Sequence, residues 1–253
     1  MSLYRKLAAL LATGLLALAL AACGGGGGEK TPVTATGTVI ATPTPRPGAG
    51  GISDEDLASM LPTKADLGTD FAGFQESAAL DTNEERVQKA DDPEDEKEDQ
   101  QTFGRVTGYD RQLVATAQSN TALFVQIGVT LLKDSEGASD YLNDNVKDIQ
   151  ARVGRTDLGM LLETLDQFPV PLLGDESLGM RTRASSPPEE GTPQTVYVTY
   201  FWFRRGRIIG DVAIARVDDT DASQSTQAIA SLLDEHIQQT LSRLSTPTAA
   251  STP

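Results

Sequence analysis

The chain has 253 residues, with 36 Asp and Glu against 21 Lys and Arg, which gives a formal charge of −15. An acidic surface repels phosphate backbones, so this composition excludes nucleic-acid binding as the function. The only cysteine is Cys23, so the chain forms no internal disulfide and its folded part must be held by packing.

The N-terminus, residues 1–22, has the pattern of a signal peptide. Arg5 and Lys6 precede an apolar run, Leu7–Leu20, which is shorter than the ~20 residues of a membrane span and suits a signal-peptide core. The run ends in Leu20-Ala21-Ala22-Cys23, which resembles the lipobox of bacterial lipoproteins. The resemblance implies that Cys23 is lipidated and anchors the chain to the extracytoplasmic face of a membrane. An ordinary signal peptide with a chance cysteine is the alternative.

Composition divides the remaining chain into a linker, a domain and a tail. Residues 23–51 are rich in Gly, Thr and Pro, as in Gly24–Gly28 and Thr42–Pro47, and such a stretch is typical of an extended spacer. Residues 52–244 are long enough for one globular domain. Residues 245–253 have a composition similar to that of the linker and predict a disordered tail.

The first half of the domain predicts a mixture of helices and strands. Its start, Ser53 to Asp56, has the pattern of a capping box before a short helix. Apolar residues alternate from Leu123 to Leu131, which predicts a strand whose other face carries Gln126, Gly128 and Thr130. The other expected elements are strands over Phe71–Leu80 and Arg105–Ala117, a helical turn over Glu84–Lys89, a helix begun by Asp134 and ending near Val153, and a shorter helix over Leu158–Leu165.

The second half predicts three strands and a terminal helix. Thr195–Phe203 is apolar or aromatic on both faces, which indicates a central strand covered on both sides. A tight turn at Arg205-Gly206 joins it to a partner strand, Arg207–Val217. Ser177–Ala184 predicts a further strand, and Asp221–Leu244 predicts the amphipathic helix.

These elements define an α+β fold, a largely antiparallel sheet packed with amphipathic helices in a single domain. Each half ends in a strand pair followed by a long helix, which hints at a structural duplication.

An acidic segment, Asp91–Asp99, holds seven acids in nine residues. It lacks the alternating spacing and the central glycine of a calcium-binding loop. A solvated acidic loop is therefore the prediction, with no metal site.

No catalytic set is recognisable. His236 is the only histidine and lies beside an apolar stripe, which favours a structural role. Asp175 and Glu176 fit a turn that enters a strand. Asp211, inside an apolar strand, suggests an ion pair with an arginine such as Arg204, with a place in the lining of a cleft as the alternative. Trp202 fits core packing, with the wall of a ligand pocket as the alternative. We expect no enzyme activity, no cofactor and no metal.

Three motifs carry a resemblance. They are a strand and helix start at Val129–Ala138, a turn at Pro171–Glu176 and a hairpin at Phe203–Ile209. Together they resemble the extracellular sensor-like domains of PknH-type kinases and related mycobacterial lipoproteins. The resemblance implies an extracytoplasmic binding domain with a cleft. Those kinase domains carry disulfides and this domain has none, and the resemblance transfers no site residue.

The expected function is that of a membrane-anchored, extracytoplasmic, non-enzymatic ligand-binding or sensor module. Its expected partners are the membrane, through the N-terminal lipid, and an unknown small molecule or envelope protein. Two alternatives stay open at this point: an envelope carrier of lipid or another hydrophobic ligand, and a carboxylate-based hydrolase.

Overall fold

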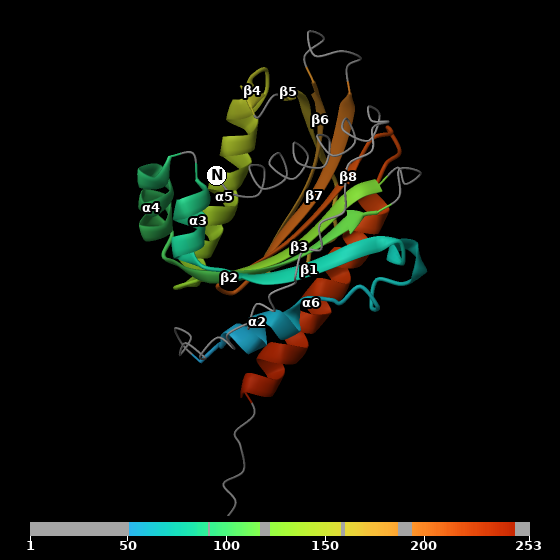
Figure 1. The fold of residues 1–253 in the computed structure, drawn as a ribbon. Coiled ribbons are helices and arrows are strands. Elements are labelled where there is room, and N and C mark those ends of the chain that lie inside the picture. Colours follow the sequence, from blue (N-terminus) through green and yellow to red (C-terminus); the bar gives the residue numbers. More distant parts are fainter. Residues whose placement is uncertain (1–50, 91, 117–121, 158–159, 187–193, 246–253) are drawn as a thin grey trace, which may run out of the picture.

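A computed structural model describes residues 51–90, 92–116, 122–157, 160–186 and 194–245 of the chain. Its centre is one eight-stranded sheet in the order β1-β2-β3-β8-β7-β6-β5-β4 (Figure 1), in which every neighbouring pair of strands is antiparallel. The strands are β1 (Phe74–Asp81), β2 (Arg105–Ala115), β3 (Ala122–Leu132), β4 (Thr156–Asp157), β5 (Met160–Phe168), β6 (Glu176–Ser185), β7 (Thr195–Arg205) and β8 (Ile208–Arg216). The predicted α+β fold with an antiparallel sheet is confirmed.

Helices cover both faces of this sheet (Figure 1). On one side α6 (Ser223–Ser245) lies across β7 and β8, with α2 (Asp54–Met60) packed beside it. On the other side α5 (Ser135–Arg152) contacts β3, β7 and β8, while α3 (Asn83–Lys89) and α4 (Pro93–Thr102) pack together beside β2. A short 3-10 helix, η1 (Thr69–Phe71), precedes β1. None of the helices in the described part of the chain is both long and apolar enough to cross a membrane.

The centre of the sheet is formed where the hydrophobic pattern is strongest. β3, β8 and β7 are neighbours, and most of their residues are buried on both faces. The prediction that Thr195–Phe203 forms a central, doubly covered strand is therefore confirmed. The turn after it contains Gly206 with φ of 58°, a left-handed conformation that glycine adopts without a Cβ penalty.

Two helix starts follow the predicted capping chemistry. The Ser53 hydroxyl accepts a hydrogen bond from the Asp56 backbone N–H, and the Asp56 carboxylate accepts one from the Ser53 N–H, which completes a capping box. At α5, the Asp134 carboxylate accepts from the backbone N–H of Gly137. Both caps bind backbone donors that a helix start leaves without an intrahelical acceptor.

Two sequence predictions are wrong. The segment Leu158–Leu165 does not form a helix, because β5 from Met160 to Phe168 pairs antiparallel with β6 along its length. Residues 158–159 lie outside the described part. A short apolar run of this kind fits either a helix or a strand, and pairing with β6 decides between them.

The acidic segment Asp91–Asp99 is not a solvated loop, since its described residues begin α4. The Asp92 carboxylate caps the helix, and Pro93 occupies the first turn, where a missing N–H costs nothing. Acids in the first turn also lie at the positive end of the helix dipole. Asp91 itself lies outside the described residues.

The hint of a duplication is also wrong. The units β2-β3-α5 and β7-β8-α6 meet where β3 pairs antiparallel with β8, but their helices lie on opposite faces of the sheet. Each unit can be viewed from the side of its own helix, with its second strand (β3 or β8) pointing up. In that view β2 lies to one side of β3, whereas β7 lies to the other side of β8. The two units therefore have opposite handedness and do not superpose.

Candidate functional site

The turn before β6 is a clamp around Arg204. The Asp175 carboxylate accepts hydrogen bonds from Arg204 Nη1 at 3.0 Å and from the Gly206 N–H at 2.7 Å. Glu176 Oε1 accepts from Arg204 Nε at 3.0 Å and Nη2 at 2.8 Å, and also from the Ser139 hydroxyl on α5. The two acids therefore join the turn, the β7–β8 hairpin and α5.

The expected ion pair between Asp211 and Arg204 is wrong. Arg204 lies directly opposite Glu176 in the β6–β7 register, whereas Asp211 lies opposite Trp202 in the β7–β8 register. The guanidinium binds its cross-strand neighbour instead. Trp202 is buried and stacks on Tyr200 with ring centroids 4.9 Å apart and planes at 10°. His236 lies half-buried on α6, away from both of these residues.

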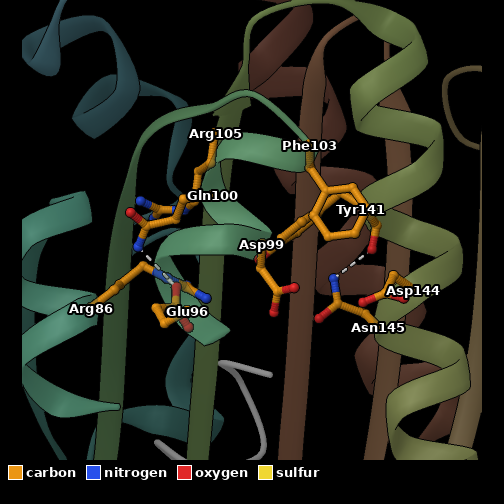
Figure 2. A pocket seen from close by; sticks show the side chains of 9 residues that line it. All are labelled: Arg86, Glu96, Asp99, Gln100, Phe103, Arg105, Tyr141, Asp144 and Asn145. Atoms are coloured by element: carbon orange, nitrogen blue, oxygen red, sulfur yellow. Dashed lines mark hydrogen bonds and ion pairs between the residues drawn. The ribbon is translucent and has the colours of Figure 1, made fainter. Parts of the chain in front are cut away.

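A small, partly enclosed pocket lies where α4 and α5 meet the start of β2 (Figure 2). In Figure 2, Asp99, Asp144 and Asn145 gather on one side of this space, while Arg86, Glu96 and Gln100 gather on the other. Its aromatic wall is formed by Phe103 and Tyr141, which pack edge to face with centroids 5.8 Å apart. The lining residues are Arg86, Glu96, Asp99, Gln100, Phe103, Arg105, Tyr141, Asp144 and Asn145.

A buried ion network supports this pocket. Arg86 donates from Nε to Glu96 at 2.9 Å and from Nη1 to Asp81 at 3.2 Å. Arg105 donates from Nη2 to Asp81 at 2.8 Å and from Nη1 to Asn83 Oδ1 at 2.5 Å. Burial opposes the charge of Arg86, but Tyr141 and the carboxylates of Asp81 and Glu96 outweigh it and raise its pKa. Two arginines and two carboxylates balance, so this network is neutral as a unit.

The network predicts a pH dependence of stability through Glu96. Burial favours the neutral acid, but the charge and hydrogen bond of Arg86 outweigh it and lower the pKa of Glu96 below its ordinary value. A lowered folded-state pKa means that ionised Glu96 stabilises the fold fully above the unfolded-state pKa of about 4.3 and loses that contribution as the pH falls. Glu96→Gln should therefore destabilise the protein at pH 7 by about 1–3 kcal/mol, and the difference should shrink below about pH 4.

Urea denaturation of both proteins between pH 7 and pH 3 measures this difference. Glu94→Gln is the matched control, because Glu94 is exposed on the same helix and its ion pair in the described part of the chain is with the exposed Lys97. A Glu96→Gln difference that stays constant across this pH range would contradict the assignment.

Two further carboxylates line the pocket without a basic partner like the Arg86 that pairs with Glu96, within the described part of the chain. Asp99 and Asp144 are half-buried, and neither forms an ion pair with a basic residue in the described part of the chain. Burial raises the pKa of Asp99, and the nearby Asp144 and Glu96 carboxylates raise it further. This side of the pocket is therefore acidic.

Further polar side chains lie along β2, β3 and β8 on the α5 side of the sheet. The position of a Cβ on Gly108 would lie 2.8 Å from Arg105 Nη2, so the Arg105 guanidinium rests over that glycine. Two residues along β2 comes Asp110, whose cross-strand neighbour on β3 is Gly128, and Gly128 in turn lies opposite Asp211 on β8. We call Asp110 and Asp211 the acid pair.

The acid pair converges over Gly128. A Cβ on this glycine would lie 2.5 Å from Asp211 Oδ1 and 2.8 Å from Asp110 Oδ1, so the two oxygens lie close together on the same side of the sheet. Asp211 is buried and Asp110 is half-buried. Only glycine at this position leaves room for both carboxylates.

Gln126 is the next residue on the same face of β3. Its side chain is fully buried, and neither its amide oxygen nor its amide nitrogen has a hydrogen-bond partner. The hydroxyl of Thr182, on β6 and also buried, lacks one as well. Buried polar groups in native proteins are normally hydrogen-bonded to protein, water or ligand, so the amide of Gln126 requires an explanation.

Sequence reasoning missed most of this site. It placed Gln126, Gly128 and Thr130 together on the polar face of their strand, and that signal was correct. It did not single out Asp110, because the convergence with Asp211 depends on the register of three strands. Within the described residues, no three side chains of His, Cys, Asp or Glu lie together in an arrangement able to hold a metal ion.

No family model matches the chain, and no curated protein matches it either. Among solved structures, it is similar to the extracellular domain of PknH from Mycobacterium tuberculosis, with a TM-score of 0.48 and 10% sequence identity. The match covers 76% of this chain and 100% of that domain. That domain is of the kind named by the motif resemblance. We transfer no residue role, ligand or activity from it.

Proposed function

We propose that this chain is a lipid-anchored, extracytoplasmic module that binds a ligand as a non-enzymatic sensor or receptor. One observation carries the proposal: beside its own apolar cluster, the α5 side of the sheet holds a group of acidic and polar side chains. Under α6 the sheet contributes an apolar cluster, and Asp234 of that helix is matched by Arg205. On the α5 side, the acidic pocket and the acid pair are polar groups that core packing alone does not require.

The N-terminal pattern supports the anchoring part of the proposal. Cys23 is the lipidation site in this scheme, and residues 24–51 form the spacer between the membrane and the domain. A diacylglycerol on Cys23 supplies two acyl chains, which anchor a protein stably, whereas a single chain gives only marginal membrane binding.

Replacing Cys23 by alanine should release the protein from the membrane fraction, because the thiol that accepts the lipid is lost. Gly24→Ala is the matched control, since it changes the neighbouring residue and keeps the thiol. Membrane fractionation and intact-mass analysis measure the outcome. A Cys23→Ala protein that still sediments with membranes would show that the N-terminal run, not a lipid, holds the chain there.

A thermal-shift screen tests the binding part of the proposal. Small cations, anions, sugars and lipids are added singly to the full-length protein in detergent, at constant ionic strength. A saturable rise in melting temperature is expected for at least one class, because a ligand that binds only the folded state stabilises it. If hydrolysis products appear instead, the carboxylate-based hydrolase replaces this proposal. A rise confined to lipids would favour the carrier alternative.

A further inference from the structure

β1 is the outermost strand at one end of the sheet, and its outer side has no neighbouring strand in the described part of the chain (Figure 1). The strand at the opposite end, β4, has only two residues, whereas β1 has eight. Five consecutive residues of β1, Gln75 to Ala79, are exposed, so neither face of the strand is covered there. β1 is therefore a long and accessible sheet edge.

One hydrogen bond shows which backbone groups point away from the sheet. The Gly73 carbonyl, just before β1, accepts a hydrogen bond from the Thr116 N–H on the β2 side. Residues that bond to the neighbouring strand alternate along an antiparallel strand, so the odd-numbered residues of β1 bond to β2. Glu76, Ala78 and Leu80 therefore direct their N–H and C=O groups outward.

Lys64 sets one limit of this free edge. Its Nζ donates a hydrogen bond at 3.0 Å to the carbonyl of Phe74, which is the preceding outward-facing residue. The carbonyl of Phe74 is therefore already occupied. The accessible edge runs from Glu76 to Leu80 and is centred on Ala78.

This edge lacks the features that usually prevent a sheet from pairing with another chain. Natural edges are protected by lysine, by proline or by a β-bulge. The segment Phe74–Asp81 contains neither lysine nor proline, and its register with β2 is continuous. The charge of Glu76 is balanced by an ion pair with Arg111 on β2. The centre of the edge is therefore nearly neutral, although the whole chain has a formal charge of −15.

The edge is complementary to a second copy of itself. With Ala78 opposite Ala78 of the second copy in an antiparallel pair, Glu76 lies opposite Leu80 and Ser77 lies opposite Ala79 of that copy. Each outward-facing residue then exchanges two backbone hydrogen bonds with its neighbour. Like charges directly opposite each other destabilise a strand pair, and this register brings none together. The small side chains at the centre leave both faces unobstructed.

We propose that two copies of this chain associate through β1, which continues the sheet from one copy into the other across a two-fold axis centred on Ala78. Two acidic chains repel each other over most of their surfaces, and the neutral edge is a place where they can meet. A contact of one strand pair is small, so the association is weak and depends on concentration. The proposal goes beyond ligand binding and does not depend on it.

Hydrogen exchange measured by nuclear magnetic resonance tests the proposal on the full-length protein in detergent, at a low and a high protein concentration. The amides of Glu76, Ala78 and Leu80 should exchange about tenfold more slowly, or slower still, at the high concentration, because they are hydrogen-bonded only in the dimer. The amides of Ser77 and Ala79 bond to β2 in both states and serve as internal references. Light scattering should show a doubling of the protein mass over the same range.

Variants at Ala78 assign the association to this edge. Ala78→Pro removes an N–H that points outward and takes no hydrogen bond from β2, a position at which an edge strand tolerates proline. It should abolish the mass doubling and the slow exchange at Glu76 and Leu80. Ala78→Val is the matched control, since it keeps the N–H and favours a strand, so the dimer should remain. If Ala78→Pro fails to fold, Ala78→Lys places two positive charges opposite each other and should weaken the dimer about tenfold or more.

Three results would overturn the proposal. The first is a protein that stays monomeric at the high concentration. The second is a mass doubling that persists in the folded Ala78→Pro or Ala78→Lys protein, which would place the contact elsewhere or in a shared micelle. The third is slow exchange of the three outward amides in a monomer, which would mean that another segment of the same chain covers the edge. Each of these outcomes leaves the result of the thermal-shift screen for ligands unaffected.

Discussion

Replacing Arg86 by alanine is expected to lower the free energy of unfolding by about 3–5 kcal/mol. The side chain is buried and joins Asp81, at the end of β1, to Glu96 on α4. Its removal leaves two carboxylates in the interior, of which Asp81 keeps its ion pair with Arg105. The loss therefore comes from the uncompensated charges rather than from the value of the ion pairs themselves. Equilibrium denaturation in urea at pH 7 measures it.

Arg243→Ala is the matched control for this prediction. Arg243 forms an ion pair with Asp56 at 2.9 Å, but its side chain is 63% exposed. Exposed pairs of this kind contribute about 0–1 kcal/mol, so the control should remain close to wild type. If Arg86→Ala and Arg243→Ala lower the free energy of unfolding equally, burial of the Arg86 network does not make its ion pairs more important for stability.

Gly174→Ala is expected to destabilise the domain more than Gly206→Ala by about 1–3 kcal/mol. Both glycines have a left-handed conformation, with φ of 63° and 58°. A Cβ on Gly174 would overlap the carbonyl oxygen of Arg204, whereas a Cβ on Gly206 would meet nothing within 4 Å. Gly206→Ala is therefore the control, since it carries the same backbone strain without a steric overlap. The difference in unfolding free energy between the two variants measures the overlap with the Arg204 carbonyl.

Thermal and urea unfolding of the two variants give the comparison. Gly174 also makes a bridge with Arg204 and precedes Asp175 and Glu176, so the backbone must move where the clamp around Arg204 is built. Near-equal losses would mean that the turn relaxes freely.

Those parts of the fold that depend on local chemistry could be predicted from the sequence. The alternation from Leu123 to Leu131 is strict enough to specify β3, and the doubly apolar run Thr195–Phe203 specifies a central strand. Asp134 caps α5 as expected, because short polar side chains before an amphipathic run bind free backbone N–H groups.

The failures have a common physical cause, which is that tertiary partners decide ambiguous segments. The acids after Asp91 read as solvated until Arg86 is placed beside Glu96, and Leu158–Leu165 reads as a helix until the pairing of β5 with β6 is known. The site was out of reach for the same reason. Asp110 and Asp211 are 101 residues apart in the chain, and the pairing of β2, β3 and β8 brings their carboxylates over Gly128.

The strand order also has a consequence for how the molecule is assembled. β3, near the middle of the chain, has as its second neighbour β8, which is the last strand in the described part of the chain and is synthesised long after β3. Until β8 is present, the edge of β3 that pairs with it stays exposed. α6 does not yet cover the apolar face of the sheet either. Such long-range pairing slows folding and favours aggregation of incomplete chains. A chain shortened before Ile208 should therefore accumulate as insoluble or degraded material.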